Sequence, residues 1–111
     1  PMATALGLVE GRIPPITVDA APFVHTRTVP YGLPGDPEVI EQVVEALADS
    51  PAVFLQNHGL LTVGWTVRHA ANRALALEGV IRIMLACRLL GREPATLPEE
   101  TAEILRQTGA L

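Results

Sequence analysis

Two short apolar segments, residues 52–55 and 60–63, flank the polar triplet Asn57-His58-Gly59. Each segment has the length of a β-strand. Asparagine tolerates the left-handed backbone of a tight turn, and glycine adopts it without steric cost. The pattern therefore predicts two strands joined by a turn that presents the imidazole of His58. A turn on a rigid scaffold can position a metal ligand or a general base, although a histidine there can also be a plain polar turn residue.

Helix signals surround this predicted hairpin. Asp36 is a favourable N-cap and Pro37 fits the first helical position, so an amphipathic helix is predicted to run from there to about residue 49. Thr66 can cap a long helix over residues 67–90, whose apolar residues occupy more than one face. We expect this second helix to pack on a sheet and to lie near a subunit interface.

Two further strands are predicted ahead of the first of these helices. Residues 23–29 alternate in side-chain direction and contain the threonines and valines that favour a pleated strand. Residues 16–18 are predicted to form a short edge strand. His25 and Arg27 fall on one face of the longer strand. That face is either solvated, in contact with another subunit, or an anion-binding surface near the site.

Composition limits the class of protein. A chain of 111 residues with 49% hydrophobic residues can form one small domain with its own core. The net charge of −4 gives no electrostatic reason to bind nucleic acid or an anionic membrane. Charged residues interrupt the apolar helix at 67–90, so it is not predicted to cross a membrane. The single cysteine, Cys87, excludes an internal disulfide and favours a cytoplasmic location.

The segment from Leu55 to Gly64, followed by a long helix that contains Ala76-Leu77-Glu78, resembles the class II aldolase/adducin family. The resemblance implies an α/β fold with a mainly antiparallel sheet flanked by helices, as part of a three-layer domain. It also implies that residues 1–111 are the C-terminal portion of one such domain. The His-x-His pair of the family is absent here, and residues 1–7 look like the segment that directly follows that pair. The resemblance thus implies an upstream half, in the same or a separate chain.

The same resemblance assigns roles to two residues. His58 corresponds to the third protein ligand of a catalytic divalent metal, most often Zn²⁺. In the family, aromatic hydroxyls from a neighbouring subunit reach the metal site, which implies a catalytic role for Tyr31. The alternative for Tyr31 is a side chain packed under its loop. Family members are commonly homotetramers, so a homo-oligomer is expected.

The sequence offers two other arrangements of polar residues. His25, His58 and His69 could form a three-histidine site, but their spacing is not that of metal ligands. Glu78 lies in an otherwise apolar helix. It could pair with Arg82 four residues later, or accept a hydrogen bond from a histidine that binds a metal.

The function implied by the resemblance is a metal-dependent lyase. It would cleave a C–C bond of a small oxygenated substrate, in the manner of a sugar-phosphate aldolase, through an enediolate stabilised by the metal. Decarboxylation of a hydroxylated aromatic acid, epimerisation and dehydration are alternatives on the same scaffold. A hypothesis of a different class is an adducin-like assembly module without catalysis.

Overall fold

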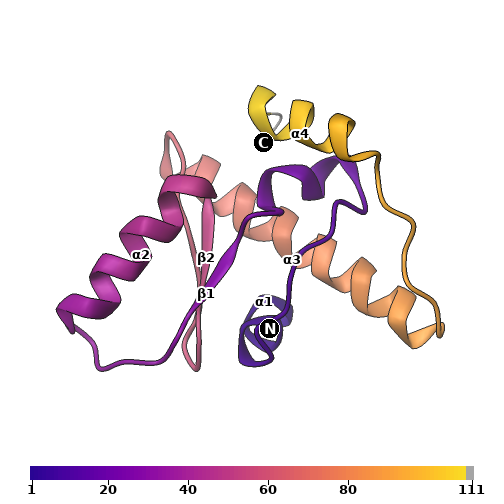
Figure 1. Ribbon diagram of the computed structural model, residues 1–111. Coiled ribbons are helices and arrows are strands. Elements are labelled where there is room, and N and C mark those ends of the chain that lie inside the picture. Colours follow the sequence, from indigo (N-terminus) through magenta and orange to yellow (C-terminus); the bar gives the residue numbers. More distant parts are fainter. Residues whose placement is uncertain (110–111) are drawn as a thin grey trace.

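The computed structural model describes residues 1–109, which form a small sheet set among helices (Figure 1). The elements in chain order are α1 (Met2–Leu8), the 3-10 helix η1 (Val18–Phe23), β1 (Arg27–Val29), α2 (Pro37–Asp49), β2 (Ala52–Leu55), β3 (Gly59–Thr62), α3 (Val67–Leu89) and α4 (Glu99–Thr108). The α/β fold class predicted from the sequence is confirmed. Within residues 1–109, no helix is both long enough and apolar enough to cross a membrane.

The strands are arranged in the order β1-β2-β3. The predicted hairpin is confirmed, since β2 and β3 are antiparallel and Leu55 lies opposite Gly59. β1 pairs with β2 in parallel, with Val29 opposite Leu55. Parallel neighbours need a crossover connection, and here α2 provides it. As a result, the carboxyl ends of β1 and β2 lie at the same end of the sheet.

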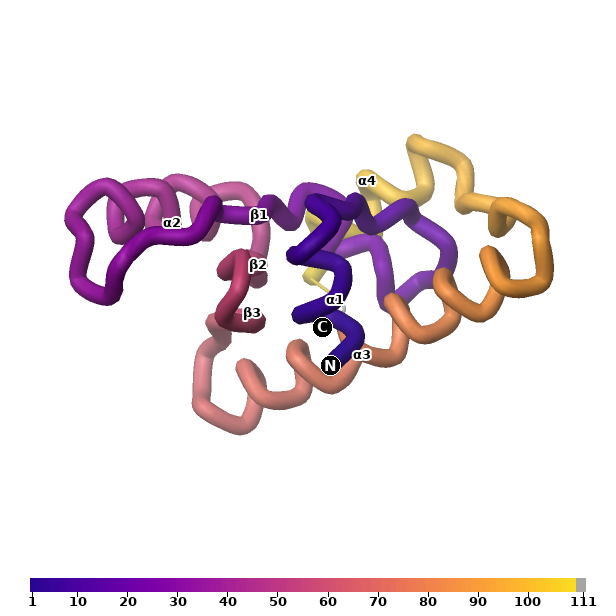
Figure 2. Tube along the Cα trace, turned by 90° about the horizontal axis from the view of Figure 1, so that it is seen from below, coloured from indigo at the N-terminus to yellow at the C-terminus, as the bar shows by residue number. Residues whose placement is uncertain are grey.

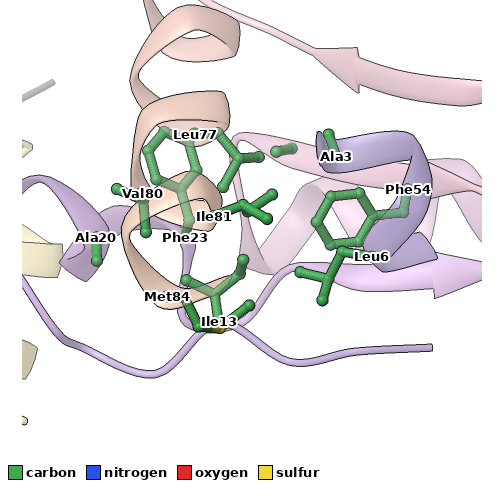
Figure 3. Packing of buried hydrophobic residues seen from close by; sticks show 11 residues of the cluster. Ala3, Leu6, Ile13, Ala20, Phe23, Phe54, Leu77, Val80, Ile81 and Met84 are labelled. Atoms are coloured by element: carbon green, nitrogen blue, oxygen red, sulfur yellow. The ribbon is translucent and has the colours of Figure 1, made fainter. Parts of the chain in front are cut away.

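Alternate residues of β2 point to opposite faces of the sheet, and each face is covered by helix. Val53 packs with Val29 and with Ala46 of α2 in the smaller apolar cluster. Phe54 points the other way, into the main core with residues of α1, η1 and α3 (Figure 3). The molecule therefore has three layers, with α2 on one side of the strands and α1 and α3 on the other (Figure 2).

Both predicted helix starts are confirmed by their capping bonds. The Asp36 carboxylate accepts from the backbone N–H of Glu38, and the Thr66 hydroxyl accepts from the N–H of His69. α3 buries Leu77 completely, yet leaves Leu75 73% exposed and Ile83 47% exposed. Apolar residues thus lie on a covered and on an uncovered side of this helix, as its sequence indicated.

Two strand predictions ahead of α2 need correction. Residues 16–18 are not a strand, because the Thr17 hydroxyl accepts from the N–H of Ala20 and starts η1. The strand predicted over residues 23–29 is confined to β1, since Phe23 still belongs to η1 and its carbonyl accepts from the N–H of Thr26. The four consecutive residues 20–23 are all buried, which a single helical turn between packed elements allows and an alternating strand does not.

Candidate functional site at the carboxyl ends of β1 and β2

The turn between β2 and β3 has the left-handed backbone that its sequence predicted. Asn57 has a φ of 64°, and the N–H of His58 donates to the carbonyl of Leu55 at 3.0 Å. Asparagine is among the few residues that adopt this conformation at little cost. The turn leaves the side chain of His58 exposed to solvent. A ligand can therefore reach His58 at the end of the sheet where β1 and β2 finish.

Tyr31 reaches the same end of the sheet from a different segment. The N–H of Gln56 donates to the carbonyl of Val29 at 3.0 Å, which extends the β1–β2 pairing by one residue. Tyr31 follows two residues after Val29, and His58 follows two residues after Gln56. The β1–α2 loop and the β2–β3 turn accordingly lie at the same end of the sheet (Figure 1).

The two predicted residues line one hollow of about 350 Å³, which we call the Tyr31–His58 hollow. Gln56 forms part of its wall, and the apolar part includes Leu33 and Leu55. Tyr31 itself is 62% exposed, so the alternative of a tyrosine packed under its loop is wrong. The structure thus places a tyrosine and a histidine around a single space large enough for a small molecule.

The loop that carries Tyr31 is held close to α2. A Cβ atom added at Gly32 would lie 2.3 Å from Cγ2 of Val39, so a larger residue there would force the loop away from the helix. Gly35 has a φ of 86° and lets the chain turn into α2. Gly32 therefore keeps the loop with Tyr31 against α2, and Gly35 allows the turn from this loop into the helix.

The other two histidines lie apart from this hollow. Nδ1 of His69 accepts from the N–H of Trp65 at 3.0 Å, at the start of α3. His25 lines a different hollow, of about 500 Å³, together with Arg27. The three-histidine arrangement is therefore not formed.

Over the described residues, the Tyr31–His58 hollow has fewer metal-binding side chains than a catalytic metal needs. Zinc sites of this kind use three protein ligands. Among residues 1–109, no group of three or more His, Cys, Asp or Glu side chains is placed to hold a metal ion. His58 offers one imidazole ligand, and the described part of the chain does not complete the set.

Glu78 contacts the start of α1, and within residues 1–109 neither Arg82 nor a histidine is its partner. Its carboxylate accepts from the backbone N–H of Ala3 at 2.6 Å and of Met2 at 3.2 Å, so α3 caps the start of α1. Burial raises the pKa of Glu78, but the two backbone hydrogen bonds and the ammonium group of Pro1, 3.3 Å from the carboxylate, lower it, and the net pKa lies below its ordinary value. The ionised carboxylate therefore stabilises the position of α1 over the sheet.

A Glu78→Gln change should lower the free energy of unfolding by about 0.5–2 kcal/mol at pH 7, the range for losing a helix cap. The pKa of Glu78 is lower in the folded state than in the unfolded state. The stabilisation by its carboxylate is therefore complete above the unfolded pKa of about 4.3, and it is lost as the pH falls from there through the folded pKa. Urea unfolding of both proteins at pH 7 and pH 3.5 measures the effect. An equal difference at both values of pH would show that the carboxylate charge is not responsible.

Gln56 is a residue of this site that sequence reasoning did not select. The signal was its position between the apolar residues of β2 and the Asn57-His58-Gly59 turn, two residues before His58. What the sequence did not show was the partner, which comes from α1: the Gln56 side-chain amide donates to the carbonyl of Gly7 at 3.4 Å.

Comparisons with known proteins identify the family. Residues 1–85 match the family model described as Class II Aldolase and Adducin N-terminal domain. The chain is 33% identical over 102 residues to 3-oxo-tetronate 4-phosphate decarboxylase of Escherichia coli O6:H1, covering 83% of this chain and 45% of that protein. It is 32% identical over 103 residues to Decarboxylase NovR of Streptomyces niveus, covering 89% of this chain and 38% of that protein.

A solved structure of L-fuculose 1-phosphate aldolase superposes with a TM-score of 0.84 at 25% identity, covering 99% of this chain and 52% of that chain. The chain therefore spans about half the length of that structure and less than half the length of the two curated relatives. Sequence and fold lead to the same family, and the relatives within it include both decarboxylases and an aldolase. The chain belongs to the class II aldolase and adducin family.

Proposed function

We propose that this chain forms part of a lyase that breaks a C–C bond next to the carbonyl group of a small, phosphorylated, oxygenated substrate. The observation that carries the proposal is that His58 and Tyr31 line one hollow at the carboxyl ends of β1 and β2. Support for the reaction class comes from relatives named as decarboxylases and as a sugar-phosphate aldolase. Both reactions leave a carbanion next to the carbonyl group, and its negative charge must be stabilised on the carbonyl oxygen.

In this proposal His58 is one protein ligand of a divalent metal, most often Zn²⁺ in such sites. The metal, when bound, would supply Lewis-acid stabilisation of the negative charge left by bond cleavage. His58 would act as a neutral imidazole, with a nitrogen lone pair directed into the hollow. Its turn, fixed by the His58–Leu55 backbone bond, holds the ring at the end of the sheet.

Tyr31 is proposed to be a general acid and not a metal ligand. Its exposed side chain lines the hollow, and a phenolic hydroxyl can donate a proton to a leaving group or hydrogen-bond to a substrate oxygen. Its loop lies against α2 through Gly32 and Val39, so the hydroxyl is carried by a defined backbone. The apolar wall contributed by Leu33 and Leu55 would exclude part of the water from the reacting carbon.

The remaining ligands are proposed to come from an upstream half of the same domain, of which residues 1–111 would be the C-terminal portion. Two observations support this. The described residues do not supply three metal ligands, and the chain spans 45% of the first relative. The upstream half would carry two further histidines, an acidic base and the anion site of the substrate. The chain would then work as a homo-oligomer, for which the uncovered apolar side of α3 offers a surface.

Decarboxylation is the first candidate reaction, because both curated relatives described above are named decarboxylases. Aldol cleavage is the second, because the L-fuculose 1-phosphate aldolase shares the fold over nearly all of this chain. The test uses the protein completed by its upstream half, assayed with 3-oxo-tetronate 4-phosphate for CO₂ release and with L-fuculose 1-phosphate for aldehyde release. We expect turnover of one of them, and none by residues 1–111 alone.

A Tyr31→Phe change should lower kcat by about 10²–10⁴-fold, the usual contribution of a general acid, and leave the metal content unchanged. Undiminished kcat in this variant would remove Tyr31 from the mechanism. Absence of both activities in the completed protein, with metal bound, would contradict the lyase proposal and favour an assembly module.

A further inference from the structure

Gln56 lines the Tyr31–His58 hollow and connects the carboxyl ends of β1 and β2 with α1. It follows Leu55, the last residue of β2, and its backbone N–H is bonded to the carbonyl of Val29 at the end of β1. Its side-chain Nε2 donates to the carbonyl of Gly7, in the last turn of α1, at 3.4 Å. The side chain is half-buried and forms part of the wall of the hollow.

The backbone of α1 comes unusually close to the strands beside this bond. A Cβ atom added at Gly7 would lie 3.1 Å from Cβ of Phe54, a contact tighter than side chains normally make. A Cβ atom added at Gly59 would lie 3.7 Å from the hydroxyl oxygen of Thr4. α1 is thus packed against β2 at Phe54 and against the start of β3 at Gly59, and the amide of Gln56 makes a polar contact with it beside the His58 turn.

We propose that Gln56 is a positioning residue that holds the His58 turn in a fixed place relative to α1. The inference rests on the proposed function, in which His58 binds a metal together with ligands that precede α1 in the chain. The position of those ligands would depend on α1, whereas the position of His58 depends on the β2–β3 hairpin. The hydrogen bond between Gln56 and Gly7 joins α1 to the hairpin two residues before His58. It would therefore set the separation between His58 and the other ligands.

The direct test is nuclear magnetic resonance on the 111-residue chain, without any metal. In the unsubstituted chain, the side-chain amide protons of Gln56 should show nuclear Overhauser contacts to Gly7. In Gln56→Leu, which keeps the bulk but removes the amide, hydrogen exchange at the His58 N–H should accelerate about 3–10-fold, as expected for losing one hydrogen bond. Core amides such as that of Ile81 should exchange at an unchanged rate.

Gln42→Leu is the matched control, since Gln42 is half-buried in α2 and does not line the hollow. It should leave exchange at His58 unchanged. Equal rates at His58 in Gln56→Leu and the unsubstituted chain, or missing contacts from the Gln56 amide to Gly7, would overturn the proposal. If Gln56→Leu does not fold, the contacts in the unsubstituted chain still decide.

A second measurement separates this inference from the proposed function. In the completed protein, Gln56→Leu should weaken zinc binding by about 10–100-fold, as losing a residue that orients a ligand does elsewhere. Gln56→Asn, whose amide is one methylene shorter, should not restore it. If the turn loosens but zinc is bound equally well, Gln56 holds the turn without setting the separation of the metal ligands, and only the zinc content of His58→Ala decides whether His58 is a ligand.

Discussion

Replacing His58 by alanine in the completed protein should remove the bound metal and lower kcat/KM by more than about 100-fold. Losing a residue that only orients a metal ligand costs about 10–100-fold, so losing the ligand itself should cost more. Stability should change by less than about 0.5 kcal/mol, because the side chain is exposed and the turn is held by backbone bonds. Elemental analysis of zinc per chain and urea unfolding measure the two effects.

His69→Ala is the matched control for this experiment. It removes an imidazole from the same chain, but one that accepts a hydrogen bond from Trp65 at the start of α3 and does not line the Tyr31–His58 hollow. We expect full zinc content in His69→Ala. Full zinc content in His58→Ala as well would refute the assignment of His58 and direct the search to ligands outside residues 1–109.

Local sequence signals predicted much of the fold. Asp36 and Thr66 fixed the starts of α2 and α3 because their capping bonds involve neighbours two and three residues away. The Asn57 turn was likewise predictable, since one residue with left-handed backbone defines it. The family resemblance around His58 then supplied the three-layer architecture, which no local signal contains.

What could not be predicted depends on contacts between distant segments. Phe23 was predicted to begin a strand, but it belongs to the buried part of the helix η1, because α3 and α4 pack against that helix. The parallel pairing of β1 with β2 follows from the path through α2, and that pairing brings Tyr31 to His58. Glu78 and Gln56 acquire their roles from backbone groups of α1 that lie 75 and 49 residues away in sequence.

The second large effect concerns α3, where two leucines two residues apart are buried to opposite degrees. Leu77→Ala should lower the free energy of unfolding by about 2–5 kcal/mol, because its side chain is completely buried in the main core and its removal leaves a cavity. That is a large share of the total stability of a small domain, about 5–15 kcal/mol. Urea unfolding of the 111-residue chain at fixed pH measures the loss.

Leu75→Ala makes the same substitution on the same helix, at a residue that is 73% exposed. In the monomeric chain it should change the free energy of unfolding by less than about 0.5 kcal/mol. In the completed protein, sedimentation velocity should show weaker self-association if the uncovered side of α3 contacts another subunit, because Leu75 would lose apolar burial there. A cost for Leu75→Ala equal to that for Leu77→Ala in the monomer would show that the two sides of α3 have been assigned wrongly. A loss confined to the oligomer would instead locate a subunit interface on α3.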